Sequence, residues 1–291
     1  MRDAGISTLR LAGREVLAII AAARGEYEAA QALVDQMVRW AAPRGIGAVH
    51  GYASSVATLA ALGQEDFEEA FRQASAISPA GVLASHRPYA TWVMMDLVTA
   101  AVAAGRREDA EAHVKALRDL NIGALSSRMA LLAAGAAAIA SPAATGVDLF
   151  ARALELPDAD RWQFDRARIE LAYGERLRRA HELVDARSHL SAALETFERL
   201  SARPWITRAA NELRATGQSR ARGDSSQREL LTPQELEIAR LAATGLTNKE
   251  IAARVFLSYR TVGTRLYRIF PKLGITSRAA LRDALDSRTQ Q

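Results

Sequence analysis

The sequence of 291 residues contains no cysteine, only three lysines and few aromatic residues. Without thiols the chain can form neither a disulfide framework nor a thiolate metal site. Aromatic residues account for 6% of the composition and runs of β-branched residues are scarce, whereas alanine and leucine dominate. This balance favours helices over strands. No lysine follows a glycine, which excludes the P-loop that binds nucleotide phosphates. We therefore predict an all-α protein without a P-loop.

Targeting and membrane segments are missing as well. The N-terminus lacks the basic and then apolar pattern of a signal peptide, so we expect a cytoplasmic protein. Residues 129–147 carry no charge, but they are mostly alanine and are interrupted by Pro142 and Gly146. We predict a buried helix and a turn in this segment, and no membrane partner.

Residue types that carry catalytic or metal chemistry form no known pattern. The five histidines lack metal-ligand spacing, and no Gly-x-Ser-x-Gly segment is present. We therefore predict that the protein is not an enzyme and uses no cofactor or metal, and that the histidines are surface or packing residues. Trp92, Trp162 and Trp205 are expected to anchor the core between helices. A groove lined by them that binds a small effector or a peptide stays open as the alternative.

The positive charge is concentrated near the C-terminus. Residues 228–291 contain 11 basic and 6 acidic side chains, so the whole net charge of +5 lies there and the preceding residues are neutral. A basic module joined to a neutral body suggests a polyanionic partner for that module. Residues 216–228 are rich in glycine, serine and arginine without apolar periodicity, which indicates a linker. We predict a helical domain over residues 1–215 and a second domain over residues 229–291.

The first domain contains an internal repeat. Alanines recur at intervals of 40 or 41 residues, at Ala30, Ala70, Ala110, Ala151 and Ala192. Glycines precede the first four of them, at Gly25, Gly63, Gly105 and Gly146. We predict helical hairpins that turn at the glycine and cross closely at the alanine. A period near 40 is typical of stacked helix pairs and predicts a tetratricopeptide-like α-solenoid; a chance repeat in an alanine-rich bundle is the alternative. The expected helices are 8–24 with 26–41, 47–62 with 65–77, 88–104 with 107–120, 125–140 with 147–155, and 161–182 with 185–200, followed by 204–215.

The second domain opens with signals for short helices. The segment from Thr232 to Glu235 predicts a capping box with proline at the first helical position, and Gly245 predicts a left-handed end to that helix. Asn248 is expected to cap a second helix over residues 249–255. Ser258 is expected to cap a third helix that extends to residue 273.

The third helix decides the functional prediction. Val262, Leu266, Ile269 and Leu273 share one narrow arc of a helical wheel, which predicts a buried stripe. Arg260 points to the opposite side, together with Thr264, and helix 258–273 holds four basic residues and no acidic one. Guanidinium groups can donate two hydrogen bonds to guanine, and a threonine methyl can contact thymine. This face therefore suits the major groove of DNA.

Residues 231–285 resemble the helix-turn-helix domain of LuxR-type bacterial transcription regulators. The resemblance is carried by Leu231-Thr232-Pro233, Asn248-Lys249-Glu250-Ile251-Ala252, Ser258, Thr261-Val262 and Lys272-Leu273-Gly274. It implies a four-helix domain that binds promoter or operator DNA as a homodimer. Three residues depart from the family pattern. Gly263 stands where a basic or polar residue is common, which either allows a closer approach to the DNA or removes a side chain that could contact a base. Arg265 stands where histidine is usual, and Pro271 should kink or end the helix. The last puts a contact between Lys272 and phosphate in doubt.

The resemblance also implies roles for individual residues. Gly263, Thr264 and Tyr267 would approach base edges. Phosphate would be anchored by Asn248, Lys249, Ser258 and Thr261. With the cationic face included, the expected DNA-binding residues are Thr232, Asn248, Lys249, Ser258, Arg260, Thr261, Gly263, Thr264, Arg265, Tyr267, Arg268 and Lys272. A fourth helix, near residues 277–285, would support dimerisation through Ala280, Leu281 and Ala284.

The repeat region resembles the helical C-terminal half of the large ATP-dependent LuxR-family regulators, around residues 173–179 and 193–197. Since this chain has no P-loop, we expect a short or truncated relative that works without ATP. The prediction is a sequence-specific DNA-binding transcription regulator that reads the major groove with helix 258–273. RNA polymerase or an unknown effector is the candidate partner of the solenoid. The alternative is a helical-repeat interaction scaffold whose basic module binds DNA weakly or without sequence preference.

Overall fold

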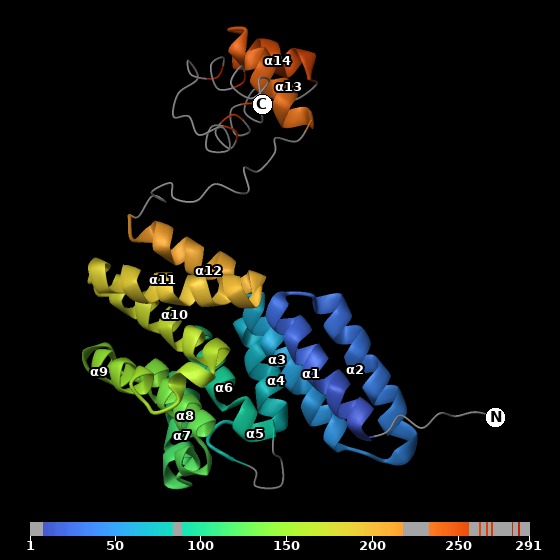
Figure 1. The fold of residues 1–291 in the computed structure, drawn as a ribbon, viewed down its shortest axis with the longest axis vertical. Coiled ribbons are helices and arrows are strands. Elements are labelled where there is room, and N and C mark those ends of the chain that lie inside the picture. Colours follow the sequence, from blue (N-terminus) through green and yellow to red (C-terminus); the bar gives the residue numbers. More distant parts are fainter. Residues whose placement is uncertain are drawn as a thin grey trace, which may run out of the picture. The chain divides into compact units, whose positions relative to one another are not determined.

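The computed structural model describes residues 8–83, 89–217 and 233–255, together with Val262, Leu266, Ile269, Leu281 and Leu285. The chain divides into two compact units, residues 1–219 and 220–291, and the division falls inside the predicted linker. Within the described residues every regular element is a helix and no strand occurs, which confirms the all-α prediction (Figure 1).

The first unit consists of paired helices that follow one another along the chain. Its elements are α1 (Thr8–Arg24), α2 (Tyr27–Ala41), α3 (Ala48–Gly63), α4 (Phe67–Ile77), α5 (Tyr89–Trp92), α6 (Met94–Ala103), α7 (Arg107–Asp119), α8 (Ser127–Ala140), α9 (Ala143–Leu154), α10 (Gln163–Arg179), α11 (Leu183–Leu200) and α12 (Arg203–Ala215). Contacts join α1 to α2, α3 to α4, α6 to α7, α8 to α9 and α10 to α11 (Figure 1). These pairs correspond to the five predicted hairpins. In the third hairpin the predicted helix 88–104 is interrupted at Val93, which separates α5 from α6.

One type of tight turn ends five of these helices. The residues with positive φ in these turns are Gly25, Glu65, Gly105, His181 and Ser201. In the first turn the Gly25 amide donates to the Ala22 carbonyl at 3.1 Å, and the Glu26 amide donates to the Ala21 carbonyl at 2.8 Å. The other four turns repeat this pair of hydrogen bonds, which defines the Schellman motif. The motif satisfies carbonyls at the end of one helix and starts the next helix immediately.

Two of the four predicted turn glycines are correct. Gly25 and Gly105 adopt the left-handed conformation that the turn requires. Gly63, by contrast, is the last residue of α3, and Gly146 lies inside α9. Because non-glycine residues occupy the remaining left-handed positions, glycine alone did not mark every turn.

The repeat of small residues also needs a corrected register. The N-caps of the second helices lie at residues 26, 66, 106, 142 and 182, so one interval is 36 residues and the others are 40. The fourth residue after each N-cap is small and buried: Ala30, Ala70, Ala110, Gly146 and Ala186. Ala151 and Ala192, which the sequence suggested for the last two hairpins, are only half-buried. The shorter fourth hairpin shifts the pattern by several residues.

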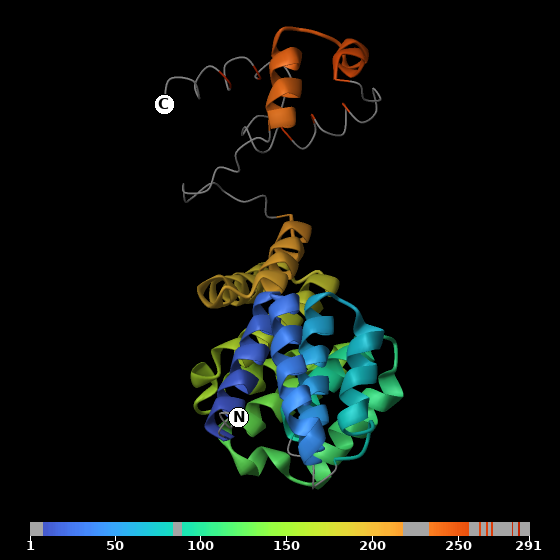
Figure 2. The same cartoon turned by 90° about the vertical axis from the view of Figure 1, so that its right-hand side faces the viewer.

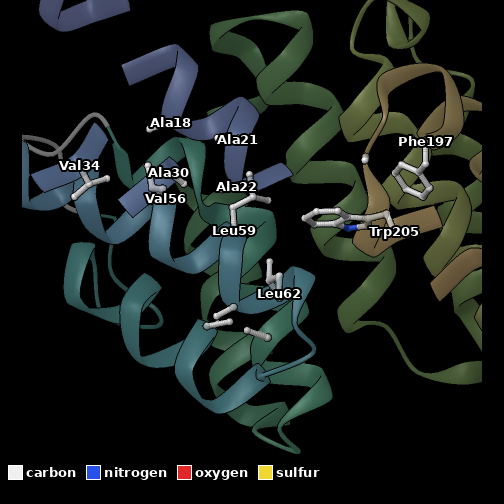
Figure 3. Close-up of a cluster of buried hydrophobic side chains, with 14 of the residues drawn as sticks. Ala18, Ala21, Ala22, Ala30, Val34, Val56, Leu59, Leu62, Phe197 and Trp205 are labelled. Carbon is white, nitrogen blue, oxygen red and sulfur yellow. The ribbon is translucent and has the colours of Figure 1, made fainter. Parts of the chain in front are cut away.

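The two ends of the first unit meet. Helix α12 contacts α1, besides α10 and α11 (Figures 1 and 2). Trp205 is buried in the same cluster as Ala22 and Leu59, and Figure 3 shows its ring pointing toward them, with Phe197 on its other side. Pro204 packs against Gly25: its Cγ lies 3.0 Å from the position that a Cβ on Gly25 would occupy. The predicted helix pairs are present, but the contact between first and last helices is one that an open solenoid lacks.

Ion pairs cross the interior of this unit. Arg168 on α10 pairs with Asp96 on α6, and both side chains are about nine-tenths buried. Arg208 on α12 makes two hydrogen bonds to Glu175 on α10, at 2.6 and 2.9 Å. Because a buried charge is costly without its partner, these pairs favour one arrangement of the helices over others.

The predicted tryptophan anchors are only partly correct. Trp205 is buried, and Trp162 is half-buried with its indole N–H donated to Ser127 Oγ at 3.3 Å. Trp92 is 42% exposed and is not a core residue. The uncharged segment 129–147 forms α8, a turn and the start of α9, as predicted. No helix in the described ranges combines the length and apolarity that crossing a membrane requires.

Candidate nucleic-acid interface

The second unit has its own apolar core. Helices α13 (Pro233–Ala243) and α14 (Asn248–Arg254) contribute five buried side chains, and residues further along the chain contribute four. The nine are Ile238, Ala239, Ala242, Ile251, Ala252, Val262, Leu266, Ile269 and Leu281. The predicted stripe is thus confirmed for Val262, Leu266 and Ile269, which are 0–4% exposed. Leu273 lies outside the described residues.

A short turn holds α13 and α14 together. Gly245 has a φ of +93°, as the predicted left-handed helix end requires, and its amide donates to the Ala242 carbonyl at 3.2 Å. The N-cap of α14 is Thr247 and not the predicted Asn248, which is the first helical residue. The reason is a capping box: the Glu250 amide donates to Thr247 Oγ1, and the Thr247 amide donates to Glu250 Oε2 at 2.7 Å.

The capping box also sets the charge at the start of α14. Hydrogen bonds from the hydroxyl and the amide of Thr247 lower the pKa of the Glu250 carboxyl, so it is an anion at neutral pH. The exposed cations of the described part of this unit are Arg240, Lys249 and Arg254, and none of them forms an ion pair with a described residue. Exposed cations without a described ion-pair partner suit contact with a polyanion.

The predicted DNA-binding residues divide into two groups. Lys249 is exposed on α14, and Asn248 beside it is half-buried and engaged in a contact within the protein. The others lie outside the described residues: Thr232, Ser258, Arg260, Thr261, Gly263, Thr264, Arg265, Tyr267, Arg268 and Lys272.

One of the predicted dimerisation residues, Leu281, lies among the described residues. Leu281 has no exposed surface and packs into the core of its own unit. A side chain buried in this way stabilises the fold of the unit, and its predicted part in dimerisation stays a prediction. Ala280 and Ala284 lie outside the described residues.

Sequence reasoning missed three residues of this unit. Thr247 could have been identified, because Thr247 and Glu250 have the spacing of a capping box. Arg240 and Arg254 carry no such signal, since their exposure follows from the packing of α13 and α14. Within the described ranges, no group of three or more histidine or acidic side chains is placed to hold a metal ion.

Comparison with known proteins identifies this unit. Residues 229–284 match the family described as bacterial regulatory proteins, luxR family, and form its helix-turn-helix domain. A protein named as an HTH-type transcriptional regulator in Mycobacterium bovis is 51% identical over 53 residues, which are 18% of this chain and 6% of that protein. GfsR of Streptomyces halstedii, also named as an HTH-type transcriptional regulator, is 45% identical over 65 residues, or 22% of this chain and 26% of its own length.

A third relative is BvgA of Bordetella pertussis, named as a positive transcription regulator of virulence factors. It is 41% identical over 63 residues, which are 22% of this chain and 30% of BvgA. The chain therefore spans less than a third of each of these three relatives. No solved structure shows significant similarity to the chain.

Proposed function

Because residues 229–284 are a luxR-family helix-turn-helix domain, we propose that this protein binds double-stranded DNA in a sequence-specific manner and regulates transcription. The observation that carries the proposal is the packing of Val262, Leu266 and Ile269 into one core with α13 and α14. A third helix held on two short ones is the architecture that presents a recognition helix to DNA, and these three buried positions are what such a helix would require.

In this proposal the segment 258–273 reads base edges in the major groove. The buried residues at 262, 266 and 269 are spaced by four and three, so they occupy one face of a helix. The opposite face of such a helix carries Arg260 and Thr264, which we assign to the bases. Lys249, exposed at the start of α14, is assigned to phosphate, together with the other cations of the unit.

We further propose that the protein binds as a homodimer, with Ala280 and Ala284 at the contact. Leu281 would support this contact only indirectly, by fixing the helix on the core. The first unit would act as the sensing or docking part of the regulator, for RNA polymerase or for an effector. Under this proposal the chain is a regulator and not an enzyme.

Selection from a random pool of duplex oligonucleotides by the purified protein tests the proposal. We expect one enriched motif, with affinity that falls steeply as salt rises because phosphate contacts release counterions. Lys249→Ala should weaken binding to all sequences about equally, whereas Thr264→Ala should change the preferred base at one position. Arg179→Gln, which removes an exposed cation from the first unit, is the matched control and should change neither.

If no motif is enriched, the sequence-specific regulator is rejected. The alternative, an interaction scaffold whose basic module binds DNA weakly or without preference, would then account for the data. Uniform, salt-sensitive binding to every duplex would be its signature.

A further inference from the structure

A polar groove of about 140 Å³ lies between the start of α10 and the second half of α11. Two small side chains line it, Ala167 from α10 and Ala192 from α11, and take up little of its space. A water molecule in the liquid occupies about 30 Å³, so the groove holds a compact molecule of several heavy atoms. It lies in the first unit, and no role in DNA binding involves it.

Carboxylates occupy one part of this groove. Glu170 is almost fully buried, with 6% of its side chain exposed, and its Oε2 lies 2.5 Å from His189 Nδ1. Its Oε1 lies 3.3 Å from an Arg166 Nη1. Asp160, in contrast, stands at the rim and is 92% exposed. A positively charged group entering the groove would therefore meet one buried and one exposed carboxylate.

The guanidinium groups of Arg166 and Arg199 supply hydrogen-bond donors to this groove. The Arg166 Nε is buried and makes no hydrogen bond, although it lies 3.2 Å from Asp160 Oδ1. Arg199 donates its hydrogen bonds to neutral groups: its Nη2 lies 3.3 Å from Thr196 Oγ1 and 3.5 Å from Gln163 Oε1. No described carboxylate forms an ion pair with Arg199. The groove thus keeps one buried N–H without an acceptor, which is costly unless an acceptor binds. Beside it lies one exposed cation without a described ion-pair partner, which an anion can reach.

We propose that this groove binds a small zwitterion of the size of an α-amino acid. The carboxylate of the ligand is held by Arg199 and Arg166, as paired donors bind a carboxylate. The ammonium is held between Glu170 and Asp160, and Thr196 with Gln163 can bond a polar side chain of the ligand. Two cations and two anions line the groove, so a neutral dipolar molecule suits it better than a multiply charged one such as a nucleoside triphosphate. The inference goes beyond DNA binding and does not depend on it.

Thermal unfolding of the full chain tests this directly. Each of the twenty common amino acids is added at 10 mM, which is on the order of the concentration that reveals millimolar or tighter binding. Acetate, ethylamine and inorganic phosphate serve as the single-charge and simple-anion probes. We expect at least one amino acid to raise the melting temperature by about 2 °C or more, and to bind in a 1:1 ratio by calorimetry. If no amino acid does so, or if acetate or phosphate gives the same shift, the zwitterion site is refuted.

Variants then place the ligand in the groove. Arg199→Gln removes the unpaired cation, and Ala192→Leu fills the space, so each should weaken binding at least about tenfold. Arg179→Gln, which changes an exposed arginine at the C-terminal end of α10 that does not line the groove, is the control and should leave the affinity unchanged. The melting temperature of each variant without ligand reports whether the fold is kept. Unchanged binding in Ala192→Leu would overturn the assignment even if an amino acid binds elsewhere.

Discussion

Gly174 in α10 is the position where close helix packing makes its clearest prediction. A Cβ added there would lie 2.5 Å from Leu190 Cγ and 3.2 Å from the carbonyl oxygen of Ala186, both on α11. Leu190 is fully buried, so its side chain has no free volume to move into. The backbone oxygen of Ala186 can move only if α11 itself shifts. We therefore expect Gly174→Ala to destabilise the first unit.

Two opposing effects set the size of this change. Alanine is favoured over glycine inside a helix by about 1 kcal/mol. Overpacking a well-filled core costs roughly 1–3 kcal/mol, and the contact with backbone places this case near the upper end. The net loss is about 1–2 kcal/mol, which lowers the melting temperature by about 5 °C for a unit of this size.

The same substitution elsewhere provides the control. Gly13 is an exposed residue of α1, and a Cβ added there would have no neighbouring atom within 4 Å. Gly13→Ala should therefore stabilise by up to about 1 kcal/mol through helix propensity alone. Thermal and urea unfolding followed by far-ultraviolet circular dichroism would measure both variants. If Gly174→Ala were as stabilising as Gly13→Ala, the close contact between α10 and α11 would be wrong.

Three further predictions concern buried and capping polar groups. Burial lowers the pKa of His113 to about 4, and neither of its ring nitrogens has a hydrogen-bond partner among the described residues. The folded state thus binds fewer protons than the unfolded state below pH 6.5. Stability should fall by roughly 3 kcal/mol between about pH 6.5 and pH 4, and urea titrations of His113→Leu across this range should lack that contribution. Glu175→Gln leaves Arg208 without its bidentate carboxylate and should cost about 3 kcal/mol in urea unfolding, whereas an unchanged midpoint would show that the pair is not formed. Thr247→Ala should cost about 1 kcal/mol in the unfolding of the second unit, and Thr247→Ser, which keeps the hydroxyl, should restore most of it.

The sequence alone predicts much of the helical architecture. Helix boundaries in the first unit agree with the expected ranges to within a few residues, because apolar periodicity and chain breaks record them locally. The buried stripe at Val262, Leu266 and Ile269 was visible for the same reason. The N-cap of α14 was missed although its signal was present, since Asn248 and Thr247 are both good caps and the Glu250 partner decides between them.

Other features depended on packing. The buried small residue of the fourth hairpin is Gly146 and not Ala151, because this hairpin is shorter than the others. No sequence pattern near residue 151 indicates the shorter length. The exposure of Trp92 and the burial of Leu281 likewise follow from which neighbours reach them. The groove beside Arg199 arises only because α10 and α11 bring small residues together.

The chain's own residues determined that it is helical, where its helices start and end, and which short basic unit carries the family's DNA-binding signature. These properties rest on interactions between residues a few positions apart, so the linear order contains them. Tertiary structure decided that the first and last helices of the larger unit meet, which charges are buried as pairs and where a polar groove opens. Those properties depend on contacts between residues far apart in the sequence, and only the packed arrangement of all the helices defines them.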